Sequence, residues 1–545
     1  MKSRTKTLAM LLEIGLLAMV PAAAADTAGL LEAGRRLYEE GVTTSTQPLV
    51  GFTTGGAELA GARAACARCH RRSGSGAFEG GNRIPAITAP ALFAPPDPAT
   101  THQPRLPPGS TVQPFRELER PPYDSAALQR ALREGIDAAG KPLQPLMPRY
   151  ALAPDDFAAL EAYLRQLSLA ASPGVAGRTL QVAMALTPDA SPAARQVATQ
   201  VLSACLAERF PETAPNALHA KLQVWDLKGA PTEWTRQLAG AQAAQPAYAM
   251  VSGVGAAHWA PIQNFCEAER LPCLFPSVDV PGTRSASRHT FYFSAGTVLE
   301  GEVMGQWINA LPPNGSPSSR VVAIRVEGDE AAAAGVNAMT QALDSALRVE
   351  ERRVATADKA ALQRAVAGLN PGDVLVLWLR APDLQALSAL APVLPPARAA
   401  IASGWLGGEA LQATPADWRK VLHFSWALDP PLRLERRMHV NLRPWLADKG
   451  LSVARTEERV AGDALTACNV FVESVARQRG PLTRDKLVEQ VENYPSAMGN
   501  AMAPEAYHQF SLGPGQRFTS KGAFVVRFAG PDWRRLEPVG DWRVP

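Results

Sequence analysis

Residues 64–70 read Ala-Ala-Cys66-Ala-Arg-Cys69-His70, and this stretch decides how the first part of the 545-residue chain folds. A helical conformation would place the two thiols about one turn apart, directly ahead of the histidine. Paired cysteines of this kind occur in redox dithiols, in halves of zinc sites and in covalent haem attachment sites. A zinc site needs a second pair of ligands, and no other pair in the sequence has a matching spacing.

The histidine beside the second thiol favours haem attachment over a redox dithiol. A thioredoxin-like dithiol follows a strand, whereas the alanine-rich approach from Glu58 to Ala65 predicts a helix. Two thiols one turn apart can reach the two vinyl groups on one edge of a porphyrin, and the next residue then lies under the iron. We therefore predict one covalent haem c, attached through Cys66 and Cys69, with His70 as an iron ligand.

The flanks of this motif resemble the cytochrome c family over about residues 30–168. Leu30–Gly41 is similar to the opening helix of the family, and Asp155–Leu167 is similar to its closing helix, with apolar residues recurring every three and four positions. The resemblance implies an all-α domain in which these helices cross. It also implies that Met147, next to a proline, is the second axial iron ligand, and that the carbonyl of Pro85 accepts a hydrogen bond from the ring of the ligating histidine.

Other roles for these residues stay open. Met147 is the only methionine between the N-terminal segment and the end of this domain, but a lone methionine can also fill a core. His102 is a competing iron ligand, and Pro85 could belong to an ordinary turn. A sixth iron position without a protein ligand would allow gas binding or peroxidase chemistry. The Gly-rich and Pro-rich residues 73–122 predict loops that wrap around the haem edge.

The N-terminus predicts export. Basic residues come first, the apolar run from Leu8 to Val20 follows, and small residues end the segment, which is the order of a secretory signal cleaved near Ala25. A membrane anchor is the alternative, but the apolar run is shorter than the roughly 20 residues needed to span a bilayer and contains Glu13. We expect a periplasmic protein with no transmembrane segment in the mature chain.

The composition is that of a globular protein with more than one domain. Hydrophobic residues make up 46% of the chain, and the formal net charge is only +4. The basic residues are scattered among acidic ones, so the sequence shows no footprint for nucleic acid or for a lipid surface. We expect a signal peptide over 1–25, a cytochrome c domain over 26–169, a linker over 170–179 and a second domain over 180–545.

The second domain has an alternating strand and helix pattern. Apolar runs typical of strands occur at 180–185, 249–252, 273–275, 320–325, 374–379 and 399–403. Amphipathic helices are predicted between them at 194–209, 261–270, 331–347 and 384–394. Strand, helix and strand at this spacing predict parallel sheets with helices on both faces, which is an α/β fold.

This part resembles the periplasmic solute-binding proteins of the branched-chain amino acid transporters, the type I periplasmic-binding-protein fold. The resemblance rests on Met250–Gly255, Ala268–Ser277, Phe291–Ser294 with Gly301 following, and Ala461–Leu465. It implies two doubly wound lobes joined by three crossing strands. The boundaries would be about 180–297 and 426–515 for lobe 1, and 298–425 and 516–545 for lobe 2.

The same resemblance implies a ligand cleft between the lobes, at the carboxyl ends of the strands. The loop after Gly253 should supply hydroxyl groups for a ligand carboxylate, but it reads Val-Gly-Ala-Ala-His, so an amino-acid ligand is not expected. The cleft candidates are His258, Asp279, Arg380 and Trp405, each of which could equally be a surface or lobe-packing residue.

Four further cysteines fall in the expected first lobe. Cys205, Cys266, Cys273 and Cys468 allow three disulfide pairings, and buried thiols are the alternative. A bond from Cys266 to Cys273 would tie a helix to the strand that follows it.

Three functions fit these features. The first is a periplasmic mono-haem cytochrome with a solute-binding-like module, which transfers electrons in a respiratory or dehydrogenase-linked chain and takes a periplasmic dehydrogenase as its redox partner. The second is an ABC-transporter-type substrate-binding receptor with an accessory haem domain. The third is an enzyme that uses an open haem site. The second domain shows no serine, histidine and acid constellation, no P-loop and no zinc motif, so we expect an electron carrier and binding protein, not an enzyme. The sequence does not identify a small-molecule ligand.

Overall fold

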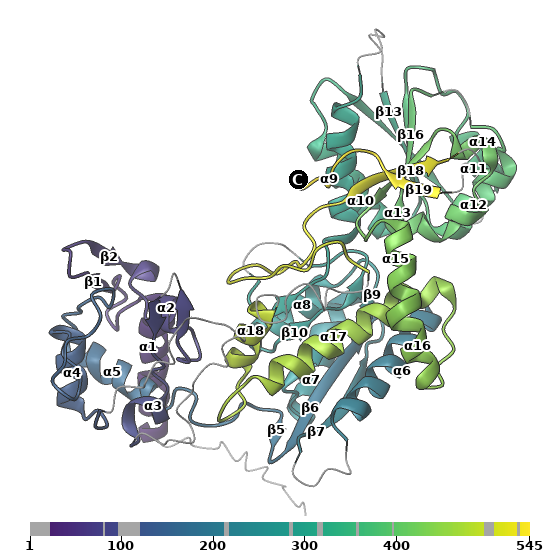
Figure 1. Cartoon of the computed structure of the whole chain (residues 1–545). Coiled ribbons are helices and arrows are strands. Elements are labelled where there is room, and N and C mark those ends of the chain that lie inside the picture. Colours follow the sequence, from purple (N-terminus) through teal and green to yellow (C-terminus); the bar gives the residue numbers. More distant parts are fainter. Residues whose placement is uncertain are drawn as a thin grey trace, which may run out of the picture. The chain divides into compact units, whose positions relative to one another are not determined.

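The computed structural model describes residues 22–79, 82–95, 120–211, 217–282, 287–312, 320–355, 359–394, 397–494, 506–530 and 535–545. The chain divides into two compact units, Met1–Ala170 and Ala171–Pro545 (Figure 1). Most of the predicted signal segment and the alternative ligand His102 lie outside the described residues. No helix in the described ranges combines the length and the apolarity needed to cross a membrane.

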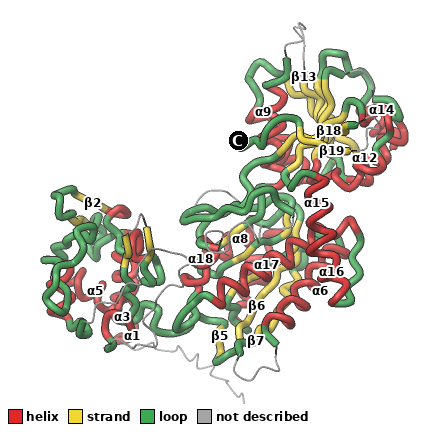
Figure 2. Tube along the Cα trace, in the orientation of Figure 1, coloured by secondary structure: helices red, strands yellow, loops and turns green. Residues whose placement is uncertain are grey.

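The first unit is built mainly from helices, with two short hairpins (Figure 2). Its helices are α1 (Ala22–Glu40), α2 (Ala67–His70), α3 (Ala89–Phe93), α4 (Ser125–Arg133) and α5 (Pro154–Leu164). Antiparallel pairs join β1 (Val50–Phe52) to β2 (Glu58–Ala60), and β3 (Ala77–Glu79) to β4 (Asn82–Ile84). The first unit is therefore not all-α, contrary to the expectation, because two short β-hairpins accompany its helices.

The helix predicted over Glu58–Ala65 is wrong. This stretch forms β2 and then one 3-10 turn at Gly61–Arg63. Leu59 pairs with Gly51 across the hairpin, and Gly61 has a positive φ of 57°, which an α-helix does not use. Alanine content favours helix, but the pairing with β1 overrides that preference.

Helices α1 and α5 cross at Gly34. A Cβ atom on Gly34 would lie 2.0 Å from the carbonyl oxygen of Ala159, so only glycine permits this approach. Next to the crossing, the rings of Tyr38 and Tyr163 pack with their centroids 5.3 Å apart. The predicted contact between the opening and closing helices is therefore present.

The second unit contains two sheets (Figure 1). In the first sheet, β6 pairs in parallel with β7 and β8, and β10 extends the sheet to β12. Its strands are β5 (Val175–Ala176), β6 (Thr179–Leu186), β7 (His219–Asp226), β8 (Ala249–Val251), β9 (Val254–Gly255), β10 (Cys273–Leu274), β11 (Ser277–Val278) and β12 (Thr290–Phe291). The helices of this lobe are α6 (Pro192–Arg209), α7 (Pro231–Ala244), α8 (Ala260–Ala268), α16 (Arg443–Asp448), α17 (Glu458–Ala476) and α18 (Arg484–Glu492).

The second sheet has the order β14-β13-β15-β16-β17-β18-β19, parallel as far as β17 and antiparallel beyond it. Its strands are β13 (Arg320–Val326), β14 (Arg348–Val354), β15 (Val374–Trp378), β16 (Ala399–Ser403), β17 (Leu422–Trp426), β18 (Phe524–Ala529) and β19 (Arg535–Pro538). Its helices are α9 (Gly296–Asn309), α10 (Glu330–Ala342), α11 (Lys359–Ala365), α12 (Ala381–Leu390), α13 (Gly404–Gly407), α14 (Ala416–Arg419) and α15 (Pro431–Arg437). Two doubly wound sheets confirm the predicted α/β class.

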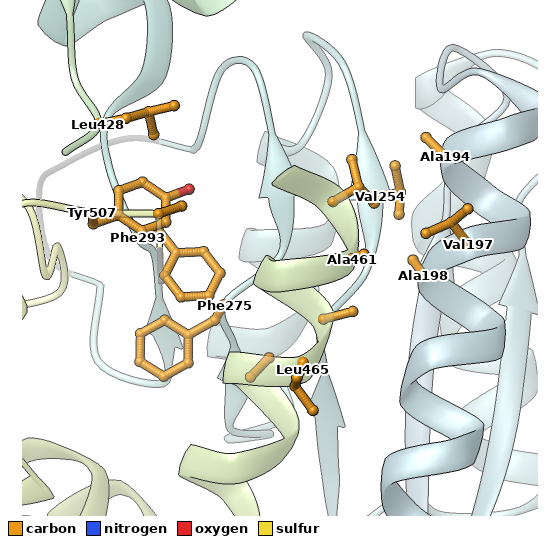
Figure 3. Packing of buried hydrophobic residues seen from close by; sticks show 14 of the residues in the cluster. Ala194, Val197, Ala198, Val254, Phe275, Phe293, Leu428, Ala461, Leu465 and Tyr507 are labelled. Carbon is orange, nitrogen blue, oxygen red and sulfur yellow. The ribbon is translucent and has the colours of Figure 1, made fainter. Parts of the chain in front are cut away.

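The chain passes between the two lobes three times, from β12 to α9, from β17 through α15 to α16, and from α18 to β18. A single cluster of buried apolar residues extends from one lobe to the other. Figure 3 shows part of it, where Phe293 and Tyr507 lie together between the lobes, with ring centroids 4.9 Å apart. The lobes therefore share packed apolar contacts at the crossings.

The sequence pattern misses several strands, including β7, β14, β17, β18 and β19, and extends two helices too far. One of these helices is α12, which ends at Leu390 and not at Leu394. The helix predicted over 331–347 ends at Ala342, and β14 follows at Arg348–Val354. This strand reads RVEERRV, lies at the edge of its sheet, and carries ion pairs from Arg325 to Glu351 and from Arg320 to Glu350. An edge strand covered by charges has no apolar alternation to reveal it.

Two disulfides stabilise the first lobe. Cys205 on α6 is joined to Cys468 on α17, and Cys266 on α8 is joined to Cys273 on β10. The structure thus selects one of the three pairings that the sequence allows, and neither disulfide includes Cys66 or Cys69.

Candidate haem site and interlobe cluster

The attachment motif forms a single helical turn. Cys66 is the N-cap of α2, and the backbone N–H of His70 donates to the carbonyl of Cys66 over 2.9 Å. The Cys66 side chain is partly buried, Cys69 is exposed, and His70 is only 6% exposed. The turn therefore holds both thiols on one short segment and directs the histidine inward.

A backbone carbonyl orients His70. The Nδ1 atom of His70 lies 2.9 Å from the carbonyl oxygen of Pro85, as the resemblance implied. A carbonyl can only accept, so Nδ1 carries the proton and Nε2 keeps its lone pair. Gly76 makes this approach possible, since a Cβ atom there would lie 2.3 Å from the carbonyl oxygen of Ile84.

Burial sets the protonation states at this site. Desolvation lowers the pKa of His70, against the opposing effect of its bond to Pro85, and so favours the neutral ring that can bind a metal. Burial raises the pKa of the Cys66 thiol to about 12. A neutral imidazole with a carbonyl partner, next to two cysteines outside both disulfides, is a donor set that fits a covalently held haem.

Met147 lies in a loop that is fixed at both ends. It is half-buried and packs against the same apolar cluster as Cys66. Two residues on, Arg149 exchanges backbone hydrogen bonds with Phe52 of β1 over 2.8 and 3.0 Å, and Thr54 donates from its hydroxyl to the carbonyl of Pro145. The position of the thioether is therefore set by the hairpin as well as by its own turn.

Tyr150 connects this loop to the attachment motif. Its hydroxyl donates to the carbonyl of Ala64 over 2.8 Å, and the side chain is buried. Sequence reasoning missed this residue. A tyrosine three positions after a candidate ligand was the only signal available, and its partner lies 86 residues away in the chain.

Three of the four predicted cleft residues come together between the lobes. Asp279 follows β11 of the first sheet, whereas Arg380 follows β15 and Trp405 follows β16 of the second. The Nη2 atom of Arg380 donates to Oδ2 of Asp279 over 3.0 Å, and the indole Nε1 of Trp405 donates to Oδ1 over 2.9 Å. Each residue lies at the carboxyl end of its strand, where sheets of this kind place their sites.

The fourth candidate is elsewhere. His258 is exposed, and its Nδ1 atom lies 3.4 Å from Asp189. In the described part of the chain it makes no hydrogen bond to the other three residues. The structure therefore does not support His258 as a member of the same cluster.

Arg459 and Asp329 belong to the interlobe cluster and were not predicted. The guanidinium of Arg459 lies over the Trp405 ring, 4.4 Å from its centroid, and Arg380 also pairs with Asp329 over 2.8 Å. Although burial opposes it, the charges of Asp279 and Asp329 raise the pKa of Arg380. The sequence signals for these residues were weak: Arg459 lies just before the Ala461–Leu465 segment, and Asp329 lies shortly after the predicted strand at 320–325.

The first unit is a mainly helical body that holds the Cys66, Cys69 and His70 turn, and the second unit is a two-lobed α/β domain. Residues 54–168 match the family model for cytochrome c, which identifies this part of the chain as a cytochrome c domain and implies haem c. A comparison with curated proteins returned no match.

The second unit is similar to solved structures of binding proteins. One is a possible leucine/isoleucine/valine-binding protein from Rhodopirellula baltica, at 15% identity and a TM-score of 0.48, covering 68% of this chain and 98% of that one. Another is a branched-chain amino acid ABC transporter protein from Thermus thermophilus with bound valine, at 11% identity and a TM-score of 0.48, covering 67% and 97%. A third is a leucine-binding protein from Thermotoga maritima, at 14% identity and a TM-score of 0.46, covering 66% and 98%.

Proposed function

We propose that this protein is a periplasmic mono-haem c-type cytochrome that transfers electrons, with the second unit serving as a recognition module. The observation that carries the proposal is the hydrogen bond between His70 Nδ1 and the carbonyl of Pro85, which presents Nε2 as a ligand beside Cys66 and Cys69. A bound haem c supplies a one-electron iron couple.

The residues of the first unit have separate tasks in this proposal. Cys66 and Cys69 would hold the porphyrin through their sulfur atoms, and His70, whose Nδ1 faces the carbonyl of Pro85, would bind the iron through Nε2. Met147 would supply a sulfur ligand to the iron from the loop that β1 and Tyr150 position. A histidine and methionine pair raises the reduction potential relative to two histidines, which suits acceptance of electrons from a periplasmic dehydrogenase.

We place the protein in the periplasm, where it would carry electrons and catalyse no reaction of its own. The basic, apolar and small-residue order of residues 1–25 supports export. Cysteines joined as disulfides in the first lobe support an oxidising compartment. The second unit would then recognise the redox partner or a small molecule.

Haem attachment can be tested on protein exported with the maturation machinery present. We expect one haem per chain that survives denaturing electrophoresis, and its loss in the Cys66→Ala, Cys69→Ala double variant. Met147→Leu should keep the covalent haem but lose the thioether-to-iron absorption band of the oxidised form and lower the reduction potential. Cys266→Ala, Cys273→Ala serves as a control, because it removes two cysteines from the second unit that are joined to each other in a short-range disulfide and should leave the covalent haem in place. Wild-type protein without acid-stable haem would contradict the proposal.

A further inference from the structure

Two sets of anion-binding donors lie in the second unit, at the carboxyl ends of strands and, for Arg459, in the first turn of α17, and carboxylates of the chain itself occupy both. The first set is the guanidinium of Arg380, the indole N–H of Trp405 and the more distant guanidinium of Arg459. The occupant is Asp279, which is 8% exposed and has both oxygens engaged. The Nη2 atom of Arg459 lies 3.9 Å from Oδ1 of the same carboxylate.

The occupant and its donors belong to different lobes. Asp279 is held in the first lobe by its backbone N–H, which donates to the carbonyl of Ala256 over 3.1 Å. Arg380 and Trp405 belong to the second lobe, whose strands β15 and β16 they follow. Each hydrogen bond to Asp279 from these two residues therefore joins one lobe to the other.

The backbone of Asp279 is held on both sides by hydrogen bonds that do not involve its carboxylate. Its carbonyl accepts from the N–H of Thr297 over 3.1 Å at the start of α9. Gly296 has a φ of 58°, and a Cβ atom on it would lie 2.0 Å from this carbonyl, so only glycine allows the contact. Asp279 thus stands next to a crossing segment between the lobes.

The second set of donors is a backbone loop. The N–H groups of Ala256 and Ala257 point at the carboxylate of Asp189 over 3.3 and 3.2 Å, and Thr187 donates to the same carboxylate from its hydroxyl. Although burial opposes it, these hydrogen bonds lower the pKa of Asp189, so the group is charged. The loop that lacks hydroxyl groups for a ligand therefore binds an internal anion with its amides.

We propose that the second unit is self-liganded: the carboxylate of Asp279 takes the place of an anionic ligand group between the lobes and holds them together without a solute. An anionic solute would have to displace a carboxylate that the backbone has already positioned. The effective concentration of such an intramolecular group is on the order of millimolar or higher, so free carboxylates at lower concentration do not compete. The unit then presents one fixed shape, and the proposal does not depend on the haem.

The test is removal of the carboxylate followed by its replacement from solution. In full-length haem-loaded protein, Asp279→Ala should speed amide hydrogen exchange at least tenfold in peptides covering 374–384 and 399–408, because these carry Arg380 and Trp405. Formate, which is small enough for the vacated space, should slow this exchange again. Formamide, which has similar size and no charge, should not. Asp279→Asn, which keeps the shape of the side chain but not its charge, should give exchange rates between those of the wild type and Asp279→Ala.

The matched control is Asp417→Ala, which removes an exposed carboxylate of the second lobe that pairs with Lys420. It should change neither the exchange of these peptides nor their response to formate. Unchanged exchange in Asp279→Ala would overturn the proposal. Faster exchange that formate and formamide reverse equally would also overturn it, because the role of Asp279 would then be packing and not charge.

Discussion

The hydroxyl of Tyr150 donates to the carbonyl of Ala64 across 2.8 Å of buried space. This one bond ties the loop of Met147 to the segment that begins the Cys66–His70 turn. The two candidate iron ligands, His70 and Met147, are 77 positions apart in the sequence. This hydrogen bond therefore holds together the two segments that carry them. The geometry of the proposed iron site depends on this contact.

Tyr150→Phe should weaken the contact between the Met147 loop and the segment that begins the Cys66–His70 turn. The carbonyl of Ala64 would lose its buried donor, at a cost of about 1–3 kcal/mol in the free energy of unfolding. We expect a lower midpoint of thermal unfolding and a weaker thioether-to-iron band in haem-loaded protein. Tyr163→Phe is the control, because its hydroxyl contacts Glu39 over a longer 3.3 Å, and the thioether band should persist in it.

Gly34→Ala should destabilise the first unit. The new Cβ would meet the carbonyl oxygen of Ala159 at 2.0 Å, so α1 and α5 would have to separate, at about 1–3 kcal/mol or more. Gly29→Ala lies on the same helix with nothing within 4 Å, and should stabilise it by about 0.5–1 kcal/mol. Thermal unfolding followed through the haem absorbance compares the two, and an equal effect would refute the assignment of the helix crossing.

The two disulfides should contribute unequally. Cys205 and Cys468 are 263 positions apart, whereas Cys266 and Cys273 are 7 apart. Loop-closure entropy predicts that replacing the first pair by alanine costs about twice as much unfolding free energy as replacing the second. Urea unfolding of the two double variants, read by tryptophan fluorescence, measures the difference.

Glu300 should make stability depend on pH. It is fully buried beneath α13, where it accepts from the backbone N–H of Trp405 over 3.0 Å, and desolvation raises its pKa from 4.5 to about 8. The folded protein keeps this proton where the unfolded chain has lost it, so stability falls as pH rises from about 4.5 to about 8. The loss amounts to a few kcal/mol, on the order of 1.4 kcal/mol for each pKa unit.

Glu300→Gln should remove that part of the pH dependence. Thermal midpoints measured between pH 5 and 9 should fall less steeply in this variant than in the wild type, since the amide does not titrate. Glu330→Gln, an exposed side chain in the first turn of α10, should retain the wild-type slope. Parallel slopes in all three proteins would show that Glu300 ionises without penalty.

Much of the haem site could be predicted from the sequence because its parts are local. Cys66, Cys69 and His70 lie within one turn, and the amphipathic repeat before Leu167 marks the closing helix without any distant partner. Pro85 is 15 positions from His70, and only its family resemblance pointed to the contact. Tyr150 was missed because the bond to Ala64 leaves no pattern in the sequence.

The two α/β lobes were predictable for a similar reason. Buried parallel strands such as Val374–Trp378 are continuous apolar runs, whereas the charged edge strand Arg348–Val354 is not, and it was missed. Asp279, Arg380 and Trp405 were recognisable as strand-end residues. Their mutual bonding, and the separate partner of His258, were not.

The sequence by itself determined the chemistry that lies within a few residues: a thiol pair followed by histidine, a closing helix, and alternating strands and helices. These signals need only backbone periodicity and fixed spacing. Tertiary structure alone decided which cysteines pair, where Gly34 meets Ala159, and that Asp279 bridges the lobes to Arg380 and Trp405. Such contacts join residues far apart in the chain, and their partners are selected by how the elements pack, which no local pattern encodes.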